Sequence, residues 1–173
     1  EQVLVMRRLI EHHLGRASAV AGAGGRIGAV TPMAETARNV SEILGKVFAD
    51  KELTINIEVD DTVVFPGHRE DLEEILGNLM ENACKWASSR VRLSARHTAG
   101  HVMLVVEDDG PGMSAEQAAE ASRRGKRFDE IAPGWGLGLS IVSDLVEVTG
   151  GTLSFTESPL GGLKACAEFP LTA

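Results

Sequence analysis

Three polar residues at helical spacing, Asn78, Asn82 and Lys85, are the first candidates for chemistry in this chain of 173 residues. At about 100° per residue they fall on one stripe of a helix, directly beside an apolar face. That face consists of Leu72, Ile75, Leu76, Leu79, Ala83 and Trp86. Amide oxygens are suitable ligands for Mg²⁺, and a lysine ammonium is a point charge for phosphate. The stripe could hold a metal-bound nucleotide, although an ordinary solvated helix face is the other interpretation.

A carboxylate followed by glycines is the second candidate. Asp108 ends the apolar segment 101–107 and precedes Gly110, Pro111 and Gly112. A carboxylate in this position can accept a hydrogen bond from an exocyclic amine, while bare glycine backbone approaches a flat ring. The simpler interpretation of the same residues is a tight turn.

Alternating glycines and a run of cations form the third candidate. Gly134, Gly136 and Gly138 open a predicted helix, where unobstructed backbone N–H groups bind phosphate oxygens. The cations in the segment before them are Arg123, Arg124, Lys126 and Arg127. A basic run is usually only solubilising. Because this one joins two candidate nucleotide contacts, we expect it to be a mobile lid that closes over phosphates.

The elements that must position these groups follow from the hydrophobic pattern. Helical periodicity predicts helices over 33–50, 68–88 and 137–149, and a further amphipathic helix over 1–13 joined through a glycine-rich connection. Period-two alternation predicts three strand pairs: 54–59 with 62–65, 90–97 with 101–107, and 151–157 with 163–169. We therefore expect an α+β sandwich of two layers, in which a mixed sheet of about five strands carries helices on one face.

Composition and charge exclude several classes of protein. The chain has 17 Lys and Arg against 25 Asp and Glu, a formal net charge of −8, which argues against a general nucleic-acid binder. Its longest apolar run, 102–106, is far too short to cross a bilayer. Cys84 and Cys166 lack the spacing of zinc or redox motifs, so we expect reduced, packed thiols in a cytosolic compartment. Because the chain begins within a helical pattern, we expect it to be a piece of a longer protein.

The order and spacing of these motifs resemble the catalytic and ATP-binding domain of sensor histidine kinases, in particular the PhoQ type. This ATP-binding fold is shared with gyrase, a heat-shock chaperone and MutL. The resemblance covers residues 33–170, with an N box over 78–86, glycine boxes over 107–113 and 134–139, and Phe128 after the basic segment. It divides the chain into 1–29, a remnant of a dimerisation helix with its linker, and 30–173, the ATP-binding kinase domain.

The resemblance also implies roles for individual residues. Asn82 and Asn78 would hold Mg²⁺, and Lys85 would contact the phosphates. Trp86 would lie against the nucleoside, and Asp108 would accept a hydrogen bond from the adenine amine. The glycine-box residues that would line the ATP site are Gly110, Gly112, Met113, Gly136, Leu137, Gly138 and Leu139.

The catalytic candidates are Lys85, Arg124, Arg127 and Glu81. The two arginines belong to the basic lid. Glu81 lies at the edge of the polar stripe, where it either polarises a group in the cleft or is a surface glutamate. No histidine lies in the sequence context of a phospho-acceptor; those considered are His12, His13, His68, His97 and His101. We therefore expect the acceptor to lie in a dimerisation domain before Glu1.

Three functions are compatible with the sequence. The first is a kinase domain that transfers the γ-phosphoryl of Mg·ATP to a histidine on the dimerisation domain, for relay to a response regulator. It implies a homodimeric parent in the bacterial inner membrane, with this domain in the cytoplasm. The second is a hydrolysing ATPase of the same fold, which needs a general base where Asn78 stands. The third is a non-catalytic nucleotide-binding or interaction module.

Overall fold

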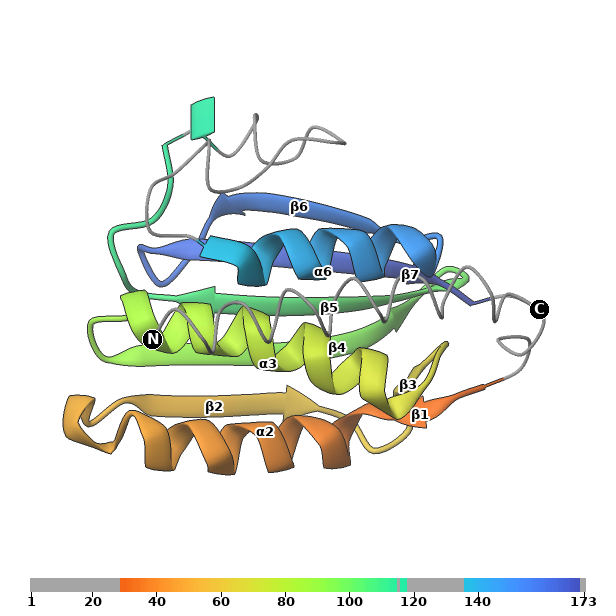
Figure 1. The fold of residues 1–173 in the computed structure, drawn as a ribbon, viewed down its shortest axis with the longest axis horizontal. Coiled ribbons are helices and arrows are strands. Elements are labelled where there is room, and N and C mark those ends of the chain that lie inside the picture. Colours follow the sequence, from red (N-terminus) through yellow and green to blue (C-terminus); the bar gives the residue numbers. More distant parts are fainter. Residues whose placement is uncertain (1–28, 115, 118–135, 172–173) are drawn as a thin grey trace.

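The described secondary structure matches the predicted helices and strands, with ends shifted by a few residues, except that the short strand Thr31–Pro32 and the 3₁₀ turn Ala49–Lys51 were not predicted. The computed structural model describes residues 29–114, 116–117 and 136–171 (Figure 1). In chain order the elements are β1 (Thr31–Pro32), α2 (Met33–Val47), a 3₁₀ turn (Ala49–Lys51), β2 (Thr54–Val59), β3 (Val64–Phe65), α3 (Arg69–Trp86), β4 (Arg90–Thr98), β5 (His101–Asp108), α6 (Gly136–Val148), β6 (Thr152–Glu157) and β7 (Leu163–Pro170). The helix predicted over 1–13 and the basic segment lie outside the described residues.

The main sheet has five strands in the order β2-β4-β5-β7-β6. β2 pairs with β4 in parallel, and the other neighbouring strands are antiparallel. The β4–β5 and β6–β7 hairpins confirm two of the predicted strand pairs. In the first hairpin Thr98 pairs with His101, and Gly100 takes a φ of +84°, which glycine adopts without strain. The predicted mixed sheet is therefore confirmed.

The predicted pairing of β2 with β3 is wrong. β3 pairs instead with β1, and β2 pairs with β4. A turn follows β2 at Asp60, whose Oδ1 accepts hydrogen bonds from the N–H and the hydroxyl of Thr62 at 2.9 and 2.7 Å. After this turn Phe65 enters the core, where its ring meets that of Phe169 edge to face with centroids 5.0 Å apart. Burial of one phenyl group thus outweighs a hairpin between neighbouring strands.

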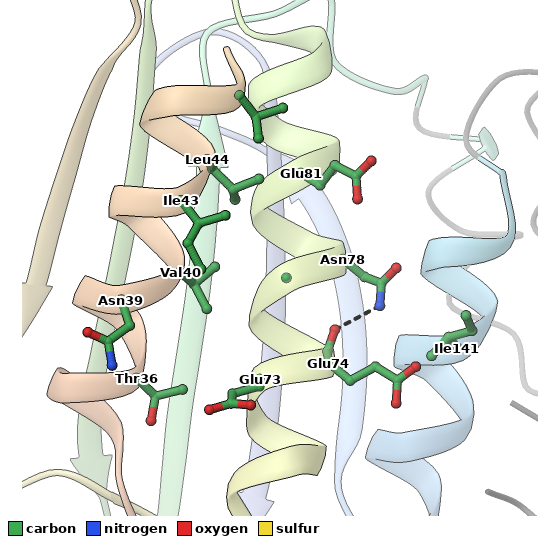
Figure 2. Close-up of a pocket in the computed structure, with 12 residues that line it drawn as sticks. Thr36, Asn39, Val40, Ile43, Leu44, Glu73, Glu74, Asn78, Glu81 and Ile141 are labelled. Atoms are coloured by element: carbon green, nitrogen blue, oxygen red, sulfur yellow. Dashed lines mark hydrogen bonds between the residues drawn. The ribbon is translucent and has the colours of Figure 1, made fainter. Parts of the chain in front are cut away.

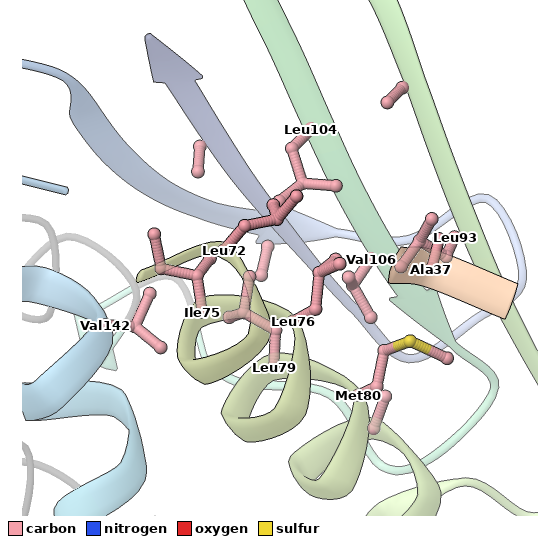
Figure 3. Packing of buried hydrophobic residues seen from close by; sticks show 14 of the residues in the cluster. Ala37, Leu72, Ile75, Leu76, Leu79, Met80, Leu93, Leu104, Val106 and Val142 are labelled. Carbon is pink, nitrogen blue, oxygen red and sulfur yellow. The ribbon is translucent and has the colours of Figure 1, made fainter. Parts of the chain in front are cut away.

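The three long helices lie over one face of the sheet, with α3 between α2 and α6 (Figure 1). Figure 3 shows the apolar face of α3 packed against the sheet, with Leu93, Leu104 and Val106 as labelled strand residues. The predicted apolar face is confirmed at Leu72, Ile75, Leu76, Leu79 and Ala83, which are at most 2% exposed. This packing fixes the rotation of α3 about its axis, and therefore the direction of its polar residues.

Both cysteines are free thiols, as predicted. Cys84 is fully buried on α3, and burial raises the pKa of its thiol to about 11. It is therefore protonated and unreactive at neutral pH. In the part of the chain that the structure describes, no helix has the length and hydropathy to cross a membrane.

Candidate functional site

The rotation of α3 places the predicted polar stripe at the margin of the core. Asn78 and Asn82 are half-buried and Lys85 is exposed. Leu79 and Ala83, each one residue further along, are buried at 2% exposure. The stripe therefore borders the apolar face, as its spacing predicts.

Asn78 is held against the beginning of α6. Its Nδ2 donates a hydrogen bond to the carbonyl O of Glu74 at 2.8 Å, and its Oδ1 faces Gly138. A Cβ atom at position 138 would lie only 2.8 Å from this Oδ1, so an alanine there would displace the Asn78 amide. The N box and the second glycine box, distant in sequence, meet in this contact.

Asp108 ends β5 with its side chain buried at 2% exposure. Its Oδ1 accepts hydrogen bonds from the N–H groups of Gly110 at 2.8 Å and Leu163 at 3.2 Å. Within the described residues, no hydrogen bond reaches Oδ2. Burial raises the pKa of Asp108, and the two backbone hydrogen bonds oppose this effect only in part. The tight turn is present, and it also holds a buried acceptor with one oxygen left for a donor.

Glycine backbone surrounds this carboxylate. A Cβ at Gly162 would overlap Asp108 Oδ1, and a Cβ at Gly110 would overlap the carbonyl O of Trp86. Gly112 has a φ of +71°, and a Cβ there would lie 3.2 Å from the carbonyl O of Gly162. The first glycine box, the end of α3 and the β6–β7 loop therefore converge. No feature of the sequence indicates the contact between Gly162, in the loop between the last two strands, and Asp108.

The last turn of α3 adds a cation and an aromatic ring near this convergence. Lys85 Nζ lies 5.2 Å from the centre of the Trp86 ring, a cation–π distance. Trp86 is half-buried and Lys85 is exposed. Met113, from the first glycine box, packs partly buried against the core.

Asp109 is a site residue that sequence reasoning missed. Its Oδ1 accepts hydrogen bonds from the N–H groups of Ser88, Ser89 and Arg90 at 2.9, 3.0 and 3.0 Å. Its Oδ2 accepts one from the Ser89 hydroxyl at 2.6 Å. Burial alone would raise the pKa of Asp109, but these hydrogen bonds outweigh it and hold the pKa well below the usual range. The predicted β4–β5 hairpin could have found this contact, because a turn at residues 99–100 sets a register that places residue 109 opposite Arg90.

Lys51 is a second residue that sequence reasoning missed. Its Nζ donates hydrogen bonds to the carbonyl oxygens of Cys84, Lys85 and Ala87 at 3.0, 2.7 and 3.3 Å. A cation is favourable there, because the last carbonyls of a helix have no partner within the helix and carry partial negative charge. No motif in the sequence signals a contact across more than thirty residues.

A groove of about 780 Å³ lies between α2 and α3 on the helical layer (Figure 2). Its apolar wall comes from α2 and its acidic wall from α3; the residues are Val40, Ile43, Leu44 and Val47, with Glu73, Glu74 and Glu81 opposite. Neither Asp108 nor Trp86 lines it. Three carboxylates make the groove unfavourable for a polyanion, so we place the candidate site at Asp108. Asn78 and Glu81 border the groove, and Glu81 is exposed.

Among the remaining candidate residues, those at the beginning of α6 are described by the structure and the two arginines are not. Gly136 and Leu137 are the first two residues of α6. The side chain of Leu139 is buried at 1% exposure, so only its backbone N–H could serve a ligand. Arg124 and Arg127 lie outside the described residues and stay predictions.

Comparisons with known proteins place these motifs in a family. The family model described as "Histidine kinase-, DNA gyrase B-, and HSP90-like ATPase" matches residues 67–173. The sensor protein kinase CarS of Pseudomonas aeruginosa is 53% identical over 106 residues, which are 61% of this chain and 24% of CarS. The sensor protein PhoQ of Escherichia coli is 34% identical over 166 residues, which are 95% of this chain and 34% of PhoQ. The chain thus spans about a third or less of the length of these relatives.

Solved structures share the fold. The mycobacterial sensor histidine kinase MprB superposes with a TM-score of 0.68 at 24% identity, over 82% of this chain and 97% of that one. Full-length ShkA, solved in complex with AMPPNP, gives a TM-score of 0.68 at 28% identity, over 82% of this chain and 31% of ShkA. The α+β architecture predicted from the sequence is that of histidine kinase catalytic domains.

Proposed function

We propose that this chain, which belongs to the family of histidine kinase-, DNA gyrase B- and HSP90-like ATPases, binds Mg·ATP and is the kinase domain of a two-component sensor. One observation carries the proposal. Asp108 is a buried carboxylate, flanked by glycine backbone and beside the α3 end that bears Lys85 and Trp86. ShkA was solved with AMPPNP, which supports a nucleotide as the ligand of this fold.

Each group at the site has a chemical partner on ATP. Asp108 Oδ2 would accept a hydrogen bond from the exocyclic amine of adenine, while Gly110 and Gly162 let the two loops pack closely around this carboxylate. Trp86 would pack against the nucleoside, and Lys85 would neutralise phosphate charge. The backbone N–H groups of α6, from Gly136 onward, would bind phosphate oxygens because a helix N-terminus favours anions.

The donor set fits Mg²⁺. The amide oxygens of Asn78 and Asn82 are hard ligands, and Mg²⁺ commonly binds through one or two protein groups together with substrate phosphates. In the described residues no group of three His, Cys, Asp or Glu side chains could hold a metal alone. Asn82 and Asn78 would hold the ion, which when bound neutralises charge on the phosphates.

Phosphoryl transfer suits these residues better than hydrolysis. It requires positioning and charge neutralisation more than covalent chemistry from the protein. A hydrolysing enzyme needs a general base, and the amide of Asn78 cannot take a proton from water. The acceptor would be a histidine on a dimerisation domain, with relay to a response regulator. We place the homodimeric parent in the bacterial inner membrane and this domain in the cytoplasm, in line with relatives named as sensor proteins.

Calorimetric titration with ATP and Mg²⁺ tests the binding step. We expect a dissociation constant between about 1 μM and 1 mM, the range usual for substrates. Asp108→Asn should weaken ADP and ATP alike by more than about tenfold, because an amide can present a donor to the adenine amine. Asp61→Asn, on the exposed pair with Arg38, is the matched control and should change nothing. A folded wild-type domain without ATP affinity would contradict the proposal.

Incubation with ATP that carries a labelled γ-phosphate tests the transfer step. The isolated chain should neither label itself nor hydrolyse ATP appreciably, and a separately made dimerisation domain should become labelled on histidine when added. Acid-labile phosphate on His12 or His13 of the isolated chain would show instead that the acceptor lies within it.

A further inference from the structure

The segment from Cys84 to Arg90, which joins α3 to β4, has its backbone bound by two charged side chains from elsewhere. Lys51 Nζ donates hydrogen bonds to three carbonyl oxygens at the end of α3. Asp109 Oδ1 accepts hydrogen bonds from the next three N–H groups, those of residues 88–90. Helix ends otherwise leave such groups to water. A cation and an anion therefore hold one short segment from both sides.

The position of this segment matters because it contains Lys85 and Trp86. Asp109 directly follows Asp108. The turn that contains the buried carboxylate therefore also binds residues 88–90, which follow Trp86 in the chain. Gly110 lies so near Trp86 that an added Cβ would overlap its carbonyl oxygen. The distance between the adenine acceptor and the Trp86 ring is thus set by one strand end and its hydrogen bonds.

We propose that Lys51 and Asp109 are positioning residues, a clamp that holds Lys85 and Trp86 in register with Asp108 for nucleotide binding. This inference rests on the proposed function, because it assigns a role in the same site. Neither residue is a catalytic residue: Lys51 acts through the backbone of residues 84–87, and Asp109 acts through the backbone of residues 88–90 together with the side chains of Ser89 and Arg90.

The clamp is distinguishable from ordinary structural support. Ser88, Ser89 and Arg90 are exposed, so water can hydrate their N–H groups when Asp109 is removed. Lys51 is likewise exposed, and its removal leaves the apolar core intact. Loss of the clamp should therefore loosen the segment more than it unfolds the domain.

Titration with ADP tests Asp109. Asp109→Ala should weaken ADP by more than about tenfold, which corresponds to about 1.4 kcal/mol. Asp109→Asn should recover most of the affinity, because its Oδ1 can still accept the three N–H groups. Asp61→Ala, an exposed acidic residue paired with Arg38, is the matched control and should bind ADP as wild type does.

A parallel pair tests Lys51. Lys51→Met keeps the alkyl chain and removes the three donors, and Lys46→Met, at an exposed position of α2, is its control. We expect Lys51→Met to weaken ADP by more than about fivefold and Lys46→Met to have no effect. The double variant with Asp109→Ala should lose less than the product of the single losses, because both act on one segment.

Trp86 fluorescence supplies a readout that a merely structural role would not move. In a Trp135→Phe background, Asp109→Ala and Lys51→Met should raise acrylamide quenching of Trp86 without nucleotide, at a temperature well below each variant's melting midpoint. If Asp109→Ala does not fold, Lys51→Met carries the test. Wild-type ADP affinity together with wild-type quenching in folded clamp variants would overturn the inference.

The same measurements separate this inference from the proposed function. A wild-type domain that binds no ADP removes the proposed function, whereas the quenching of Trp86 still reports whether Lys51 and Asp109 fix the segment. Unchanged quenching in that case would overturn the clamp as well.

Discussion

Asp108 acts against the stability of the domain at neutral pH. Its carboxylate is buried, and burial raises its pKa in the folded state. A carboxyl group whose pKa is higher in the folded than in the unfolded chain favours folding less as the pH rises through its range. The charge is therefore unfavourable for folding, and its retention is consistent with a ligand that needs an acceptor.

The raised pKa of Asp108 leads to the first prediction about stability. Asp108→Asn should raise the free energy of unfolding of the nucleotide-free domain by about 0.5–1 kcal/mol at pH 8, because the backbone donors keep an acceptor and the buried charge is gone. Denaturation in urea at pH 8 and pH 5 measures it. The gain should shrink in acid, where wild-type Asp108 takes up a proton in the folded state. A gain that grows as pH falls would show that the pKa is lowered instead.

Gly138 gives the second prediction. Gly138→Ala should destabilise the domain by about 0.5–1.5 kcal/mol, because the new methyl group displaces the Asn78 amide and weakens its hydrogen bond to Glu74 O. Gly45→Ala in α2 is the control: a Cβ there meets nothing within 4 Å, so alanine should stabilise the helix by about 0.5–1 kcal/mol. Thermal unfolding of both variants measures the difference. Equal gains at both positions would show that α3 and α6 are not held this closely.

At the scale of elements, α3 links the core to the site. Leu76→Ala should lower the free energy of unfolding by about 2–5 kcal/mol, because Leu76 is fully buried at the centre of the helical layer. Glu73→Ala, on the exposed side of the same helix, should change it by less than about 0.5 kcal/mol. Urea denaturation distinguishes the two. A small loss at Leu76 would mean that α3 is not packed as described.

The elements also show which parts of the structure the sequence can predict. The apolar face of α3 follows from helical spacing, and the β4–β5 register follows from a short turn at Gly100. The same register could have predicted the contact of Asp109 with residue 90. The partner of β3 could not be found this way, because it depends on the burial of Phe65 against Phe169. The contact of Lys51 with α3 has no local signal either, because it joins residues more than thirty positions apart.

At the scale of the whole molecule, the proposed transfer reaction needs residues beyond those described. Arg124 and Arg127 stand three apart, so on a helical turn they face the same way. With the acceptor domain supplied, Arg127→Ala should lower the transfer rate by more than about tenfold and change ADP affinity by less than about threefold. Lys85→Ala should weaken ATP more than ADP as well as slow the transfer. Phosphotransfer kinetics and ADP titration measure both quantities.

The control for Arg127→Ala is Arg96→Ala, at an exposed position of β4 away from the site. It should leave the transfer rate unchanged. If Arg127→Ala behaves like Arg96→Ala, the basic run is surface charge, the second interpretation of its sequence.

The pairing of β1 with β3 determines which elements would bear a mechanical force applied to the chain before residue 29. β1 is the first described strand, and Thr31 Oγ1 donates a hydrogen bond to Gly67 O at 2.8 Å, two residues before α3 begins. α3 is a rod of about 27 Å, with Lys85 and Trp86 at its far end. A pull or twist on the chain before residue 29 would therefore be borne by the near end of this rod as well as by α2. Lys85 and Trp86, which we propose bind the nucleotide, lie at the other end of α3.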